Sequence, residues 1–163
     1  MTLEFDPTAF VSPLADIEPS VRGSRYVIGA RSYIDSFVKF KPAGGSGDIV
    51  IGESCVFNSG CVLYSGNGIT VGNAVSVAAN CVFAPTNHQF DDPDTFIQQQ
   101  GFRPSKGGIV IEDDVWLGAG CVILDGTHIG KGAVIGALTL VRGEVPPYAI
   151  AAGNPMTIRG SRR

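Results

Sequence analysis

The chain has 163 residues, a formal charge of −3 and only 17% charged residues. This length suits one domain with its own core, and the charge leaves no basic footprint for nucleic acid and no polybasic patch for a membrane surface. No apolar run approaches the roughly 18 residues of a membrane span, and the opening MTLEFDPTAF lacks the basic and apolar stretches of a signal peptide. We therefore expect one cytoplasmic domain over residues 1–163, with no nucleic-acid partner and no membrane insertion.

The chain begins with a short, proline-containing segment and then repeats every six residues. Residues 1–27 predict irregular first coils in which Ile17 and Val21 keep the repeat. From Ile28 onward the first residue of each hexad is apolar in all fourteen cases. These residues are Ile28, Ile34, Ile51, Phe57, Leu63, Val71, Val77, Phe83, Ile111, Leu117, Ile123, Ile129, Ile135 and Val141.

Two further positions of the hexad have a preferred residue type. The second position is often glycine, which we expect to turn the corner with unusual backbone dihedrals. The fifth is mostly small or β-branched, and all four cysteines occupy it. Inward-facing residues at the first and fifth positions predict short strands stacked around a narrow prism, in which each coil buries its face against the next. Three hexads would make one triangular coil.

The repeat is interrupted twice by polar segments. Residues 39–48, KFKPAGGSGD, are glycine-rich and predict an extruded loop. Residues 89–110 follow His88 and are too polar and proline-rich to continue a coil. Loops this long in a compact domain are usually functional or disordered, and the aromatic residues Phe90, Phe96 and Phe102 argue against plain disorder.

The last hexads, IVIEDDVWLGAGCVILDGTHIGKGAVIGALTLV, lead into VRGEVPPYAIAAGNPMTIRG, which includes a closing tail over residues 146–163. Together with the His88 loop, these motifs resemble the hexapeptide-repeat acyltransferases, in the branch of maltose, galactoside and xenobiotic O-acetyltransferases and the sugar acetyltransferases of polysaccharide pathways. The resemblance covers about residues 10–160. It implies an all-β, left-handed parallel β-helix, a homotrimer with active sites between subunits, acetyl-CoA as cosubstrate, and a sugar or sugar-nucleotide acceptor.

The resemblance gives His88 a chemical role. A lone histidine is more often structural or merely exposed, but in the family a histidine at the start of an extruded loop removes the proton of the acceptor hydroxyl or amine. An imidazole with a pKa near neutrality suits that task. We expect a backbone carbonyl or a nearby side chain to hold its ring. His128, at the end of a regular hexad, is interpreted as an exposed side chain.

Three further residues are candidates for acceptor binding. Asn58 matches an acceptor-binding asparagine of the galactoside branch, or is a corner asparagine in a left-handed conformation. Asn87 either bonds locally or shapes the site. Trp116 faces outward, where the family has the active site and the thiol end of the cofactor; an interface packing role is the alternative. Asn80 is interpreted as a corner residue.

The resemblance also implies a cofactor groove near the C-terminus. Trp116, Ala137, Arg142 and Arg159 are its candidate residues, with the arginines placed for coenzyme A phosphates. The spacing after Pro155 makes Arg159 a weaker match than Arg142. Leu138 replaces a residue that is usually small in the family, so it either narrows the groove or points elsewhere.

The predicted chemistry needs neither a metal nor a covalent intermediate. The shared position of the four cysteines favours small inward-facing fillers over a disulfide or a metal site. Only two histidines are present, which argues against a three-histidine zinc hydratase. We expect direct transfer of an acetyl group from acetyl-CoA to a hydroxyl or amino group of a sugar or sugar nucleotide. The alternative is a non-catalytic β-helix that serves as a scaffold or assembly module. The choice between O- and N-acetylation and the acceptor stay open.

Overall fold

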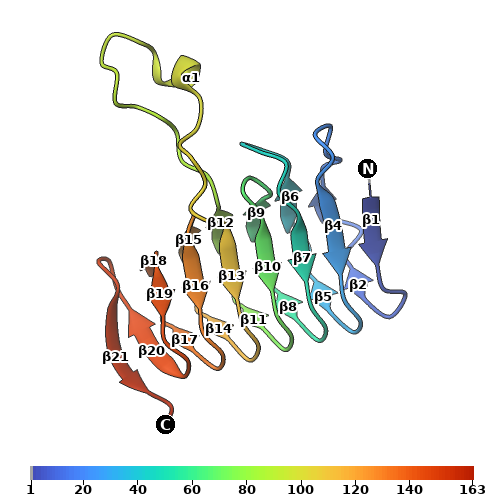
Figure 1. The fold of residues 1–163 in the computed structure, drawn as a ribbon. Coiled ribbons are helices and arrows are strands. Elements are labelled where there is room, and N and C mark those ends of the chain that lie inside the picture. The colour runs from blue at the N-terminus through green and yellow to red at the C-terminus, as the bar shows by residue number, and fades with distance from the viewer. Residues whose placement is uncertain (1) are drawn as a thin grey trace.

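The computed structural model describes residues 2–163, so Met1 and its share of the predicted first coil lie outside the described residues. The strands form three parallel sheets that make the walls of a triangular prism (Figure 1). Sheet A contains β1 (Thr2–Phe5), β4 (Arg25–Ile28), β7 (Ile49–Ile51), β10 (Ile69–Val71), β13 (Ile109–Ile111), β16 (Thr127–Ile129) and β19 (Glu144–Val145). This is the predicted left-handed β-helix.

The other two walls follow the same order along the prism. Sheet B contains β2 (Phe10–Val11), β5 (Tyr33–Ile34), β8 (Val56–Phe57), β11 (Ser76–Val77), β14 (Trp116–Leu117), β17 (Val134–Ile135), β20 (Ala149–Ala152) and β21 (Thr157–Ser161). Sheet C contains β3 (Asp16–Ile17), β6 (Lys39–Lys41), β9 (Val62–Tyr64), β12 (Val82–Ala84), β15 (Val122–Leu124) and β18 (Leu140–Val141). The antiparallel β21 closes the C-terminal edge of sheet B by pairing with β20.

The core confirms the hexad pattern. All fourteen first-position residues are exposed by 2% or less, and the small residues at the fifth position are also buried. The four cysteines are free and buried, as expected of fillers. Their thiols also donate hydrogen bonds to backbone carbonyls of the following coil, for example from Cys55 to Gly72 at 3.1 Å and from Cys121 to Gly136 at 3.2 Å.

The corners differ from the prediction in their stereochemistry. The left-handed backbone occurs at the fourth position of the hexad, with φ between 55° and 76° at residues such as Arg31, Asn80 and Gly120. The second-position glycines are needed for a different reason, which is close stacking of successive corners. A Cβ on Gly29 would lie 2.6 Å from the backbone of Gly52, well inside van der Waals contact.

The first coil is more regular than predicted. β1, β2 and β3 pair in parallel with β4, β5 and β6, so the coil joins all three sheets. Ile17 packs against the core, but Val21 is 96% exposed and does not keep the inward repeat. It lies in the connection between β3 and β4, which loops away from the core.

The longer connections leave the prism at one corner, between sheet C and sheet A. We call this corner the loop edge, and its connections are residues 18–24, 42–48, 65–68, 85–108, 125–126 and 142–143. The first predicted loop is shorter than expected, because Lys39–Lys41 form β6 with Phe40 buried. The second starts and ends slightly earlier, because Ile109 and Val110 belong to β13. Residues 85–108, which we call the arm, carry the one-turn helix α1 (Ile97–Gln100).

Candidate active site

The arm projects away from the prism (Figure 1). His88 lies near its start, shortly after β12 ends at Ala84. Its two strands meet in an antiparallel bridge between His88 and Phe102. The Arg103 amide donates to the Asn87 carbonyl at 2.8 Å, and the Gln89 amide donates to the Gly101 carbonyl at 3.0 Å. These bonds fix the backbone on both sides of His88, although the repeat that builds the prism has ended.

The His88 ring is exposed and packs against one aromatic neighbour. The centroids of the His88 and Phe102 rings are 4.7 Å apart, with the planes tilted by 37°. Within residues 2–163 no hydrogen bond to the imidazole is formed, so the expected polar anchor is replaced by this ring contact. In the sequence, Phe102 argues only against disorder. Its contact with His88 could not be predicted, because the intervening segment has no repeat that sets their spacing.

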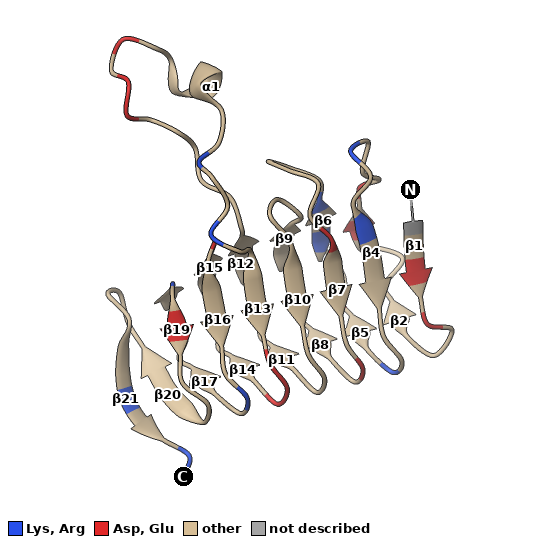
Figure 2. Cartoon of the chain, viewed as in Figure 1, with Lys and Arg blue, Asp and Glu red and all other residues tan. Residues whose placement is uncertain are grey.

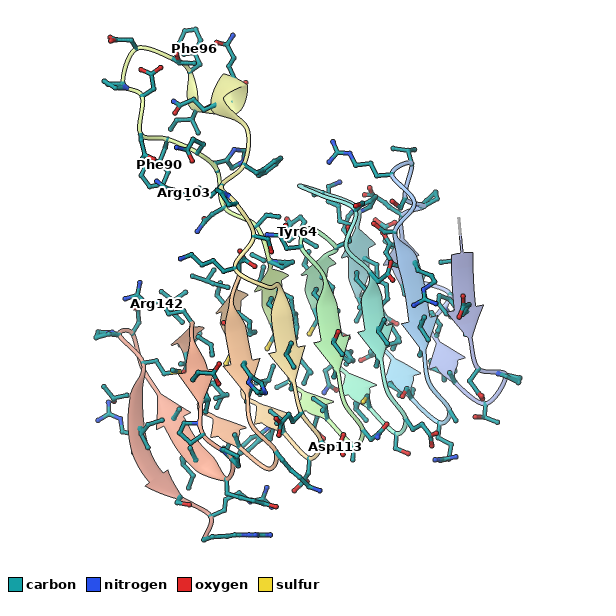
Figure 3. The ribbon with its side chains drawn as sticks, in the orientation of Figure 1. Tyr64, Phe90, Phe96, Arg103, Asp113 and Arg142 are labelled. Carbon is teal, nitrogen blue, oxygen red and sulfur yellow. The ribbon has the colours of Figure 1, made fainter. Side chains whose placement is uncertain are left out.

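The arm is braced by a cation and by its own polar side chains. The Arg103 guanidinium lies 2.7 Å from the Asp91 carboxylate and 4.4 Å from the centroid of the Phe90 ring (Figure 3). Nearer the tip, Asp92 accepts hydrogen bonds from the Asp94 amide and the Thr95 hydroxyl. These two bonds, the hydroxyl first, hold the pKa of the Asp92 carboxyl below its usual value.

The tip of the arm carries exposed apolar side chains beside acidic ones. Phe96 is 79% exposed, and Phe90 and Ile97 are also exposed. They line an open concavity of about 590 Å³ with Asp92 and Pro93. The acidic residues of the arm lie away from the prism, whose central strands are mostly uncharged (Figure 2). A tip of this kind, held away from its own prism, has the character of a surface that packs on another molecule.

Two of the predicted site residues meet at the root of the arm. Asn87 and Arg142 line a cavity of about 100 Å³, together with Arg103, Lys106 and other residues of the loop edge. Asn87 also accepts the Arg103 amide through its carbonyl, so it bonds locally and lines the cavity at once. The sequence did not point to Arg103 or Lys106, because their proximity to Arg142 depends on how the arm folds back.

The other predicted site residues lie on different parts of the prism. Asn58 and Ala137 are at the corner between sheets B and C, Trp116 is 53% exposed on sheet B, and Arg159 is on β21. Asn58 does not have the left-handed backbone offered as its alternative; its amide donates to the Val77 carbonyl at 2.8 Å. Asn80 does have it, with φ of 61°.

Leu138 and His128 have defined surroundings. Leu138 adopts the left-handed corner conformation and is 78% exposed, so it points outward beside Ala137. His128 is only partly exposed, and its ring lies between Glu112 at 2.9 Å and Glu144 at 3.1 Å on the wall of sheet A. The hydrogen bond from the Lys131 amide and, after it, the one with the His128 ring keep the pKa of the Glu112 carboxyl below its usual value. His128 thus contacts two carboxylates on the wall of sheet A and is not a free side chain.

The described residues were also compared with the patterns of metal sites and of membrane-spanning helices. Within residues 2–163, no three His, Cys, Asp or Glu side chains are grouped so that they could hold a metal ion. In the same part of the chain, no helix has the length and apolar character needed to cross a membrane.

Comparison with known proteins identifies the family of this chain. Residues 108–143 match the family model of the bacterial transferase hexapeptide with six repeats. A chloramphenicol acetyltransferase from Agrobacterium fabrum is 31% identical over an alignment of 163 positions, which covers 92% of this chain and 75% of the relative. The chain belongs to the hexapeptide-repeat acyltransferases.

Other hexapeptide-repeat acyltransferases agree in fold. A hexapeptide-repeat-containing acetyltransferase from Vibrio cholerae matches with a TM-score of 0.69 and 30% identity, over 83% of this chain and 73% of that one. The structure of AntD, an N-acyltransferase from Bacillus cereus, in complex with dTDP and 3-hydroxybutyryl-CoA matches with a TM-score of 0.81 but 20% identity, over 99% of this chain and 83% of AntD. At that identity, the likeness to AntD shows the fold alone.

A further relative shares only part of its length with this acyltransferase. A 2,3,4,5-tetrahydropyridine-2,6-dicarboxylate N-acetyltransferase from Staphylococcus aureus is 46% identical over 55 residues, which is 34% of this chain and 23% of the relative. Such a short match carries no information on the acceptor.

Proposed function

We propose that the protein transfers an acetyl group from acetyl-CoA to a hydroxyl or amino group of a sugar or sugar nucleotide, with His88 as general base. The observation that carries this proposal is the position of His88, exposed at the root of a folded arm on the outer wall of a filled prism. Because side chains fill the prism, a substrate has to bind outside it, and the arm supplies a wall for such a site.

The reaction is a direct transfer within a ternary complex. His88 takes the proton of the acceptor O–H or N–H while the acceptor atom attacks the thioester carbon. The tetrahedral oxyanion accepts a hydrogen bond from a backbone N–H, an interaction typically worth a few kcal/mol. The C–S bond then breaks, the acetyl group stays on the acceptor, and the coenzyme A thiolate takes up a proton from the His88 imidazolium.

Trp116, Ala137, Arg142 and Arg159 are the proposed contacts of coenzyme A, and Asn58, Asn87 and Trp116 those of the acceptor. Their separation on one chain supports a site completed by another copy. We therefore propose a homotrimer in which the apolar tip of the arm packs on a neighbouring subunit. The outward-facing side chains of sheet B would also suit an interface, because the residues in register with Trp116 and Val134 along this sheet are all uncharged. In order, these residues are Phe10, Tyr33, Val56, Ser76, Trp116, Val134 and Ile150.

The acceptor class follows from the resemblance. AntD, a protein with the same fold, has been solved in complex with dTDP-4-amino-4,6-dideoxyglucose and coenzyme A, so the fold can accommodate such an acceptor. We place the reaction in surface-polysaccharide synthesis in the cytoplasm, where acetyl-CoA and sugar nucleotides occur together. The relative named as a chloramphenicol acetyltransferase adds chloramphenicol to the acceptors that should be screened.

The first test is a calorimetric titration with acetyl-CoA, with the oligomer mass measured by light scattering. Saturable binding at one site per chain of a trimer supports the proposal. A folded protein that binds no acetyl-CoA would contradict it and favour the non-catalytic scaffold.

The second test is an acceptor screen with His88→Ala. Loss of a general base typically lowers the rate by about 10² to 10⁴, and we expect a fall of that order in kcat with acetyl-CoA affinity retained. His128→Ala is the matched control, because the His128 ring lies against Glu112 and Glu144 on the wall of sheet A. Equal activity in His88→Ala and the wild type would exclude His88 as the base.

A further inference from the structure

The first two residues of the arm leave the prism without backbone hydrogen bonds of their own. β12 ends at Ala84, and the bonds that fix the arm begin at Asn87, whose carbonyl accepts an amide from the returning side of the arm. Between them, in the part of the chain that the structure describes, Pro85 and Thr86 form no backbone hydrogen bond. Packing at these two residues therefore sets the direction in which the arm leaves the prism, and with it the place of His88.

Thr86 packs against two glycines of neighbouring connections, which leave the prism on the same side as the arm (Figure 1). A Cβ on Gly44, in the connection 42–48, would lie 2.7 Å from the Thr86 Cγ2 atom. A Cβ on Gly66, in the connection 65–68, would lie 2.6 Å from the same methyl carbon. Non-bonded carbon atoms pack at about 3.5–4.0 Å, so a side chain at either position requires Thr86 to move. We call Gly44 and Gly66 the glycine seat.

The glycine seat is held by its own hydrogen bonds. The Gly66 amide donates to the Ala43 carbonyl at 3.0 Å, and the Gly66 carbonyl accepts the Gly47 amide at 2.8 Å. A third bond runs at 3.0 Å from the Ser65 amide to the carbonyl of the last residue of β6. These bonds join the two connections to each other and to the prism, whereas the backbone of Thr86 has none. A group added at the contact therefore displaces Thr86 rather than the seat.

We propose that Thr86 is a positioning residue: packed on the glycine seat, it sets where His88 lies relative to the prism. His88 follows Thr86 by only two residues, so a shift of one is passed to the other. The catalytic consequence rests on the proposed function, but the link between the seat and the place of His88 does not. The glycine-rich segment 39–48 thereby has a role, which is to support the proposed base of a later coil.

The main test is Gly44→Ala. The added methyl overlaps the Thr86 side chain, and a misplaced catalytic group can cost up to about 100-fold in rate. We expect kcat to fall by about ten- to a hundredfold, with little change in the KM for acetyl-CoA, because the proposed cofactor contacts belong to the prism. Denaturant unfolding of each variant shows whether the fold is retained.

Gly23→Ala is the matched control for backbone strain. Gly23 lies on the same loop edge and has φ of 87°, close to the 77° of Gly44, so alanine is equally unfavourable at both. A Cβ on Gly23 meets nothing within 4 Å. This variant should keep the kcat of the wild type. Equal kcat in the two glycine variants would overturn the proposal.

A compensating change tests whether the effect runs through Thr86. Thr86→Ala removes the two side-chain atoms nearest to a methyl on Gly44 and leaves the Thr86 Cβ at 3.1 Å. In Gly44→Ala combined with Thr86→Ala, the new methyl takes the space that Thr86 gives up. The kcat of this double variant should return to within about threefold of the wild type, as expected of coupled neighbours. A double variant as slow as Gly44→Ala would refute the role of Thr86.

Two further variants separate packing from other causes. Thr86→Val keeps the shape of the side chain without its hydroxyl, so it should retain wild-type kcat; a loss as large as that of Gly44→Ala would overturn a role based on packing. If Gly44→Ala does not fold, Gly66→Ala takes its place. Its compensating partner is Thr86→Ser, which removes only the methyl that lies 2.6 Å from the added Cβ.

The position of His88 has a measurement that does not depend on activity. Crystal structures in one crystal form, superposed on the prism strands, should show the His88 Cα displaced by about 1 Å in Gly44→Ala, because the contact has to open to at least about 3.5 Å. Gly23→Ala and the double variant should show no displacement. An unmoved His88 in Gly44→Ala would overturn the proposal. If the wild type acetylates no acceptor, the proposed function fails, while this displacement still decides on the glycine seat.

Discussion

At the scale of single residues, the contact between His88 and Phe102 has the clearest functional consequence. The ring centroids lie 4.7 Å apart, and no hydrogen bond within the described chain orients the imidazole. Phe102 is itself partly exposed, so its removal should leave the fold intact and free the His88 ring to rotate. A displaced catalytic group can cost up to about 100-fold in rate.

We predict that Phe102→Ala lowers kcat by about ten- to a hundredfold, with little change in the KM for acetyl-CoA or in the free energy of unfolding. Phe102→Tyr should retain activity, since it keeps the ring. Steady-state kinetics and denaturant unfolding would test this. An alanine variant as active as the wild type would show that His88 is positioned by another group, for example one from a neighbouring subunit.

At the scale of elements, the arm is a folded unit whose order depends on few side chains. Gln100 receives the Asp92 amide on its side-chain oxygen at 3.1 Å and donates to the Asp92 and Thr95 carbonyls at 2.8 and 2.7 Å. It therefore joins α1 to the turn that precedes it. A single turn of helix is not stable without such contacts.

We predict that Gln100→Ala speeds amide hydrogen exchange across residues 92–101 while the prism keeps its wild-type protection. Gln99→Ala is the matched control, because Gln99 is an exposed residue of the same turn. Hydrogen exchange followed by mass spectrometry gives both values in one experiment. Comparable exchange in the two variants would mean that apolar contacts, not Gln100, hold the tip together.

At the scale of the whole molecule, the four buried thiols report on opening of the stacked coils. Burial raises the pKa of the Cys55 thiol, so the folded protein keeps it protonated and unreactive. Because the thiol of the unfolded chain ionises first, near pH 8.5, the stability that the neutral thiol contributes is present below that pH and declines as the pH rises further.

We predict that a thiol reagent at pH 7 modifies none of the four cysteines of the native protein and all four in denaturant. The modification rate in intermediate denaturant should follow unfolding measured by circular dichroism. Rapid reaction of one cysteine under native conditions would indicate that its coil opens alone, as solenoids can when neighbouring repeats couple weakly.

The sequence predicted the prism well and the site only in part, for one physical reason. Residues such as Ile28 and Cys55 recur with the coil, so their burial follows from their spacing. The recurring glycine at the second position of the hexad suggests that the unusual dihedrals lie there, whereas the left-handed φ occurs at the fourth position, as at Leu138. The second position needs glycine because the next corner approaches it closely. The pairing of His88 with Phe102 depends on a fold without any repeat.

The loop edge has a consequence for how such proteins diversify. Its connections range from two residues, 125–126, to the whole arm, yet the strands on either side keep their parallel register. Chain length can therefore change there at no expense to the stacked core. A new substrate preference can arise by lengthening, shortening or exchanging one segment, which makes this edge a natural place for segment grafting between relatives.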